Sequence, residues 1–190
     1  MPYENLAFYI STGILLFALF IQSKEKTKKF IKPLFWTTSV LVLGYLSYIT
    51  YLQYKAFQKS YLDLTIGTLD GLKWFAGYVQ LHFWNTYLVS FVAALLIFAL
   101  AKYINKKRGE VFLEGEEIYL GGLGVLLVGY PSFFFYIPLV LLLAIITSLI
   151  TKKQKERLPL YYFWMPTAIL VLLVIFFWAE HQSWWFTFRF

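Results

Sequence analysis

The sequence predicts an all-α polytopic membrane protein, a bundle of six transmembrane helices with a short fourth span and an interfacial helical loop. Of the 190 residues, 60% are hydrophobic and only 14% are charged, whereas a soluble domain has about 25% charged residues. The apolar residues also form long runs, and a helix needs roughly 20 of them to cross a bilayer core about 30 Å thick. We therefore expect one membrane domain over residues 1–190, surrounded by the lipid bilayer.

The positive charges lie in short clusters between the apolar runs. Residues 23–32 hold five Lys, residues 102–108 hold four Lys or Arg, and residues 152–157 hold four more. Such clusters are typical of the cytoplasmic loops of membrane proteins, so the net charge of +7 indicates topology and predicts no nucleic-acid partner. The pattern places these loops in the cytoplasm and both termini outside, in the inner (plasma) membrane.

The first three spans are predicted at about residues 5–21, 34–53 and 83–103. Pro2 and Pro33 lie near the starts of the first two, where a helix does not use the missing N–H group. The third contains four alanines that permit close helix packing, namely Ala93, Ala94, Ala99 and Ala101. Residues 54–82 join the second and third spans and alternate aromatic and polar residues. This pattern predicts one or two short helices in the headgroup layer.

Residues 118–150 contain no formal charge, and as one helix they would be about 50 Å long, too long for a single crossing. Gly129 and Pro131 supply a break in the middle. We therefore predict a helical hairpin with a short fourth span at 116–130 and a fifth at 133–151. The sixth span is predicted at 160–178, with a kink near its start at Pro166.

Acidic residues are few, and four of the ten lie together around the start of the fourth span, at Glu110, Glu114, Glu116 and Glu117. Glu116 and Glu117 are placed where the helix enters the membrane on its cytoplasmic side. Ionisable groups at such a depth suggest a functional site. The alternative is that they interact favourably with the positive end of the helix and with the preceding basic run, without any function.

The stretch from Glu114 to Gly129 resembles the Gly-x-Gly-Asp motif and the following helix of the type IV prepilin peptidases. In that family a Gly and an Asp open a transmembrane helix and a second Gly follows eight residues after the Asp, a spacing matched by Gly115, Glu116 and Gly124. Residues 152–166 are similar to the basic loop and Pro-rich segment that precede the family's last helix. The family core also has six helices.

The resemblance implies a membrane aspartyl endopeptidase that cuts prepilin-type leader peptides at the cytoplasmic membrane face. It implies Glu116 and Glu25 as the catalytic carboxylates, and Gly115, Glu117 and Pro159 as substrate-binding residues. The sequence departs from the family at three points. Glu116 stands where the family has Asp, and Leu113 replaces the first Gly of the motif. At the first site the family has Asp, basic residues and then Ile-Pro, whereas the only acid here is Glu25 and Lys32 separates Ile31 from Pro33.

Because of these departures, two further functions stay open. One is a catalytically inactive relative that binds such substrates or serves as an assembly scaffold, and the other is a small channel or transporter built on broken helices. The sequence predicts no cofactor and no metal site, since His82 and His181 are isolated at separate membrane edges and a metal site needs several converging ligands. The oligomeric state stays unassigned.

Overall fold

The described part of the chain is helical throughout. The computed structural model describes residues 2–58, 68–108, 113, 115–151 and 160–178, without the side chains of residues 2–6, 25, 26, 108 and 151. Within these ranges there is no β-strand. The elements follow in the order α1 (Pro2–Ser23), η1 (Glu25–Phe30), α2 (Ile31–Gln58), α4 (Leu69–Val79), η2 (Gln80–Trp84), α5 (Asn85–Arg108), α6 (Gly115–Val128), α7 (Phe133–Thr151), η3 (Leu160–Tyr162) and α8 (Trp164–Phe177).

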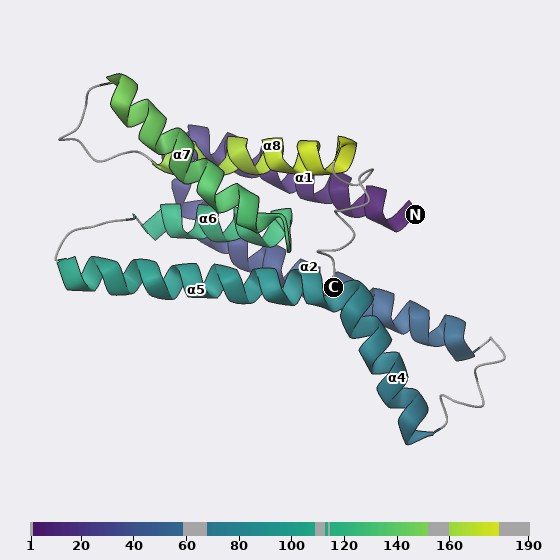
Figure 1. The fold of residues 1–190 in the computed structure, drawn as a ribbon. Coiled ribbons are helices and arrows are strands. Elements are labelled where there is room, and N and C mark those ends of the chain that lie inside the picture. Colours follow the sequence, from purple (N-terminus) through teal and green to yellow (C-terminus); the bar gives the residue numbers. More distant parts are fainter. Residues whose placement is uncertain (1, 59–67, 109–112, 114, 152–159, 179–190) are drawn as a thin grey trace.

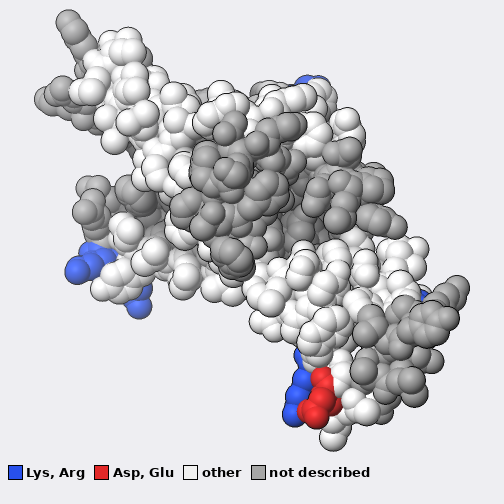
Figure 2. Space-filling model, turned by 45° about the vertical axis from the view of Figure 1, so that its right-hand side comes forward, with Lys and Arg blue, Asp and Glu red and all other residues white. Residues whose placement is uncertain are grey.

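Four helical segments are long and apolar enough to cross a membrane: Thr27–Gln58, Leu69–Lys107, Phe133–Ile150 and Leu160–Phe177. Their surfaces carry many large exposed hydrophobic side chains, such as Leu41, Leu96 and Ile146. In Figure 2 the visible Lys and Arg side chains lie in small groups at the edges of the molecule, away from the broad uncharged surface. Exposed hydrophobic surface of this extent needs lipid to cover it, so the chain is a membrane protein.

Helix α6 forms the centre of the bundle. It has only 14 residues, and 11 of them are buried. Helices α5, α8, α2, α7 and α1 all contact it, and Figure 1 shows it enclosed between α5 and the α7–α8 side. At 1.5 Å per residue α6 is about 21 Å long, shorter than a bilayer core. Because other helices surround α6, its length does not need to match the lipid thickness.

Aromatic side chains of the neighbouring helices fill the space left by three glycines of α6. A Cβ atom on Gly121 would lie 3.1 Å from the Trp164 ring, and one on Gly122 would lie 2.6 Å from the Phe98 ring. A Cβ on Gly124 would lie 2.6 Å from Cζ of Tyr136. These rings therefore pack directly on the α6 backbone, as small residues allow between membrane helices.

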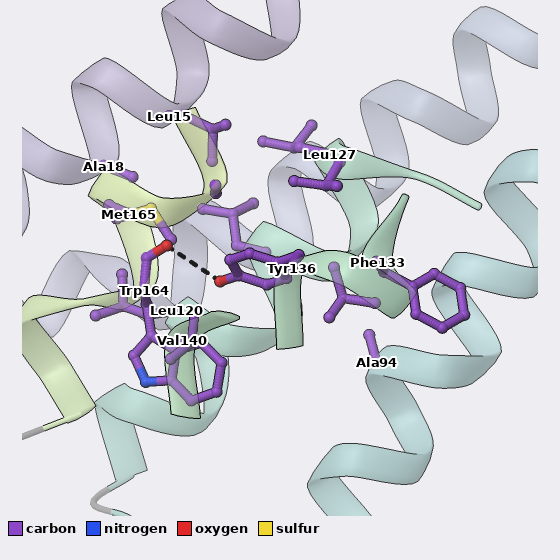
Figure 3. Close-up of a cluster of buried hydrophobic side chains, with 14 of the residues drawn as sticks. Leu15, Ala18, Ala94, Leu120, Leu127, Phe133, Tyr136, Val140, Trp164 and Met165 are labelled. Atoms are coloured by element: carbon purple, nitrogen blue, oxygen red, sulfur yellow. Dashed lines mark hydrogen bonds between the residues drawn. The ribbon is translucent and has the colours of Figure 1, made fainter. Parts of the chain in front are cut away.

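The buried cluster around α6 draws on five helices. Figure 3 shows Leu15 and Ala18 of α1, Ala94 of α5 and Met165 of α8 converging on α6 and α7. Tyr136 of α7 is fully buried among them and donates its hydroxyl hydrogen to the backbone oxygen of Trp164 at 3.1 Å. This hydrogen bond satisfies the one polar group of an otherwise apolar ring and joins α7 to the start of α8.

The predicted hairpin between the fourth and fifth apolar segments is confirmed. Helix α6 ends at Val128, and Gly129 adopts a positive φ of 77°, a conformation that glycine takes without steric cost. The Gly129 N–H donates to the oxygen of Val125, and the Phe133 N–H donates to the oxygen of Gly129. Helix α7 then begins at Phe133.

The predicted kink at Pro166 is wrong. Helix α8 begins at Trp164, after the short 3₁₀ turn η3, so Pro166 lies in the first turn. The first helical turn has no intrahelical acceptors for its N–H groups, and proline is tolerated there. The predicted sixth span, 160–178, matches the helical segment Leu160–Phe177, but its first residues form the 3₁₀ turn η3 and the α-helix begins only at Trp164.

The segment between the second and third apolar runs contains one described helix, α4, and its placement in the headgroup layer stays a prediction. Helix α4 is not separate, however: it continues through a π-helical turn, Gln80–Trp84, directly into α5. Figure 1 shows α4 bending away from α5 at this point, beside the far end of α2. Asp70 at its start is exposed and pairs with Lys73 at 3.6 Å, while Asp63 lies outside the described residues.

We predict that adding one methyl group at Gly124 destabilises the protein. Tyr136 cannot easily move aside because it is buried and hydrogen-bonded, so Gly124→Ala should lower the unfolding free energy by about 1–3 kcal/mol, the usual cost of overpacking. Gly13→Ala is the matched control, since a Cβ at Gly13 has nothing within 4 Å. Thermal unfolding in detergent micelles measures both variants, and equal stability of the two would contradict the close packing.

Candidate acidic site

Four elements meet at one end of the bundle: the end of α1, the 3₁₀ helix η1, the first turn of α6 and the turn η3. The chain reaches this end after the first apolar run and again before α6 and α8. Exposed lysines surround it, including Lys24, Lys29 and Lys32. It is therefore the end at which the acidic first turn of α6 faces the first basic loop.

Glu117 is the buried carboxylate of this end. Its side chain is 3% exposed, and its Oε1 accepts a hydrogen bond from the backbone N–H of Tyr161 at 3.0 Å. A charged carboxylate is tolerated in such a position only where hydrogen bonds and charges compensate it. The N-terminal end of α6, on which Glu117 is the third residue, adds a favourable dipole.

Three polar groups of Tyr161 form hydrogen bonds that hold this residue in place. Glu117 accepts from its N–H, the Gln22 side-chain nitrogen donates to its backbone oxygen, and its hydroxyl donates to the backbone oxygen of Gln22 at 3.1 Å. Gln22 is the last buried residue of α1 and is 3% exposed. These bonds tie the ends of α1 and α6 to the start of α8, and we refer to Gln22, Glu117 and Tyr161 as the Tyr161 clamp.

The segment that carries Glu25 packs against the clamp. The ammonium group of Lys28 lies 5.0 Å from the centroid of the Tyr161 ring, a distance at which a cation is attracted to an aromatic face. Lys32 approaches the Tyr119 ring of α6 at 6.0 Å. Because Lys28 follows Glu25 by one turn of the 3₁₀ helix, the backbone of Glu25 belongs to the same end of the bundle as α6.

The start of α6 is fixed from the other side by α5. The Asn105 side chain donates to the backbone oxygen of Leu113 at 3.0 Å and accepts from its N–H at 3.3 Å. Leu113 itself is buried. A two-point amide contact of this kind sets the backbone position two residues before α6 begins, so α5 and η3 together determine where Glu116 and Glu117 lie.

The predicted site residues occupy different environments. Glu116 is partly exposed and precedes the buried Glu117 on α6. Gly115 is exposed, and a Cβ there would meet nothing within 4 Å, so no close contact requires a glycine. The Glu25 side chain and Pro159 lie outside the described residues.

Three residues of this site were not singled out from the sequence, namely Gln22, Asn105 and Tyr161. Gln22 reads as an ordinary polar residue at the end of an apolar run, and Tyr161 is one of several aromatic residues in its segment. Gln22 and Tyr161 gain their roles from contact with each other, although they are 139 positions apart, whereas Asn105 binds the backbone of Leu113 eight positions further on. Local patterns carry no signal for such pairs.

The other polar candidates lie elsewhere. His82 is exposed and stacks on Tyr78 with 4.3 Å between ring centroids. It lies one helical turn before Thr86, which contacts the residues that follow α6, so His82 is near the opposite end of α6 from Glu116 and Glu117. Ser90 donates to Thr86 of its own helix. Within the described ranges, no group of three or more His, Cys, Asp or Glu residues is placed to hold a metal ion.

Comparison with known proteins identifies no relative: no family model, no curated protein and no solved structure matches the chain. The class that the fold defines is a helical membrane protein with an acidic helix start held at one end of its bundle. Its function has to be argued from that site.

We predict that Glu117 and Glu116 differ sharply in their effect on stability. Glu117→Ala leaves the buried N–H of Tyr161 without its acceptor, which costs about 1–3 kcal/mol. Glu116→Ala is the matched control and should change the unfolding free energy by less than about 0.5 kcal/mol, as surface substitutions do. Unfolding in micelles followed by tryptophan fluorescence tests this pair, and a silent Glu117→Ala would show that the clamp is not stabilising.

Proposed function

We propose that the chain is a membrane endopeptidase of the prepilin-peptidase type that acts on leader-bearing substrates at the cytoplasmic membrane face. Glu116 and Glu25 are its pair of carboxylates. The observation that carries the proposal is the contact of Lys28 with Tyr161, whose N–H is bound by Glu117. This contact brings the Glu25 segment and the start of α6 to one place.

The chemistry requires two carboxylates close together that share one proton, so that one acts as a base and the other as an acid. Glu116 takes a proton from water as the water oxygen attacks the scissile carbonyl carbon. Glu25 supplies a proton to that carbonyl oxygen, which gives a tetrahedral gem-diol. As the peptide C–N bond breaks, Glu116 gives the proton that it took from water to the leaving amine nitrogen, and Glu25 takes back a proton from a gem-diol hydroxyl, so that both carboxyl groups return to their starting states. The Tyr161 clamp holds the start of α6, because small misplacements of catalytic groups cost rate steeply.

The proposal includes six membrane crossings with both termini outside. The four long apolar helices are supplemented by α1 and α6. Helix α1 contains the apolar helix Ala7–Ser23, which ends at the site. Helix α6 crosses inside the bundle, where its length does not have to match the lipid thickness. The three basic clusters of the sequence then face the cytoplasm together, as the positive-inside rule predicts, and they suit a substrate that approaches from that side.

A non-catalytic role in binding the same substrates is the second candidate. It is favoured by the engagement of Glu117 in the clamp, which leaves Glu116 as the partly exposed carboxylate of α6. Glutamate is also one methylene longer than the aspartate of the family pattern. A channel or transporter is disfavoured, because rings pack on the middle of α6 where a solute pathway through broken helices would pass.

Cleavage of a leader-bearing prepilin peptide by the purified protein in lipid nanodiscs tests the enzyme. We expect Glu116→Gln and Glu25→Gln each to lower the cleavage rate by roughly 100-fold or more, as loss of a general acid or base does. Asp70→Asn is the control, because Asp70 is exposed and distant from α6, and it should leave the rate unchanged.

The two candidates separate in the same assay. If wild-type protein crosslinks to the leader peptide and does not cut it, the chain is a binding protein. If it neither cuts nor crosslinks while an authentic prepilin peptidase does both, both proposals are rejected.

A further inference from the structure

A cavity of about 290 Å³ lies between α1 and α2, away from the acidic site. Four residues of α1 and four of α2 form its two walls, and Tyr87 of α5 and Leu127 of α6 complete its lining. The lining is almost entirely apolar. Nothing in the proposed peptidase chemistry uses this space.

The cavity opens sideways toward the surface that contacts lipid. Ile10 and Leu41 in its lining are 48% and 61% exposed, whereas Ser11, Thr38 and Leu127 are 8%, 2% and 5% exposed. The exposed residues form the rim and the buried residues form the floor. Whatever enters therefore comes from the medium around Ile10 and Leu41.

The depth of the cavity excludes a polar headgroup. The α2 residues that line it run from Thr38 to Tyr45, which is about 10–21 Å along the helix from Ile31 at the basic end. With a hydrocarbon core about 30 Å thick, this range lies within the acyl-chain region. A hydrocarbon occupant is required at this depth, since polar groups without partners are costly there.

The size of the cavity suits a single hydrocarbon chain. Its volume of about 290 Å³ exceeds that of an apolar protein cavity of about 150 Å³ that already binds benzene. At this depth the medium around Ile10 and Leu41 consists of the acyl chains of the bilayer, so an acyl chain is the occupant that the opening meets.

We propose that this cavity binds one acyl chain of a membrane phospholipid as a specific, retained ligand. The acyl chain fills the gap between α1 and α2. The 3₁₀ helix η1 connects these two helices at the basic end of the bundle. The proposal does not depend on the peptidase activity, because it uses only the cavity and the membrane environment.

Photo-crosslinking tests the proposal. The purified full-length protein is reconstituted with a phosphatidylglycerol that carries a diazirine in one acyl chain, irradiated and digested, and the labelled peptides are identified by mass spectrometry. We expect labelling concentrated in residues 7–14 and 38–45. Ala7→Phe places a ring in the lining and should reduce this labelling by roughly tenfold, the ratio that corresponds to about 1.4 kcal/mol.

Ala99→Phe is the matched control, because Ala99 is exposed on α5 and outside the cavity lining. It should leave labelling of the two segments unchanged, and thermal unfolding should show both variants folded. Uniform labelling of all lipid-facing helices, or labelling that Ala7→Phe does not reduce, would overturn the proposal. Displacement of the lipid by a leader peptide, or crosslinked dimers through this face, would assign the cavity to another occupant and overturn it as well.

Discussion

The structure depends on the close approach of aromatic rings to the backbone of α6. Three glycines leave room for Trp164, Phe98 and Tyr136, and each ring belongs to a different neighbouring helix. Because lipid is as apolar as these rings, such packing and not hydrophobic burial drives helix association in a membrane. The contacts of these rings hold α5, α7 and α8 around the short helix α6, which is enclosed by them. As a consequence, the acidic first turn of α6 is fixed beside the ends of α1 and η1.

At that end, two adjacent glutamates have separate environments. Glu117 is buried and bound to the backbone of Tyr161, whereas Glu116 is partly exposed. Successive residues on a helix point about 100° apart, so one can join the packed interior while its neighbour faces the space at the end of the bundle. The hydrogen bond of Glu117 holds the first turn of α6 in place, and the accessible Glu116 on the same turn is therefore held in position, as its proposed chemistry requires.

The sequence predicts the apolar helical segments and the hairpin because these follow from local properties, namely the length of the apolar runs and the break at Gly129. It does not predict that α6 is central, since the same composition suits a lipid-facing helix. Pro166 was misread because the apolar run starts before the helix does. Glu117 was predicted to bind substrate, and its place in the clamp depends on Gln22 and Tyr161, which only the folded chain brings together. The cavity between α1 and α2 also has no local signal, because its lining residues are ordinary lipid-facing types.

The central claim is that the Glu25 segment and the start of α6 form one acidic site. Bridging of paired cysteines tests it most directly, since the chain has no cysteine of its own. In a Glu25→Cys, Glu116→Cys double variant, a reagent that joins only sulfur atoms a few ångströms apart should bridge the two thiols. A Glu25→Cys, Asp70→Cys pair should stay unbridged, because α4 lies at the other end of the molecule (Figure 1). Failure of the first pair to bridge, with both thiols reactive toward a small alkylating reagent, would contradict the account.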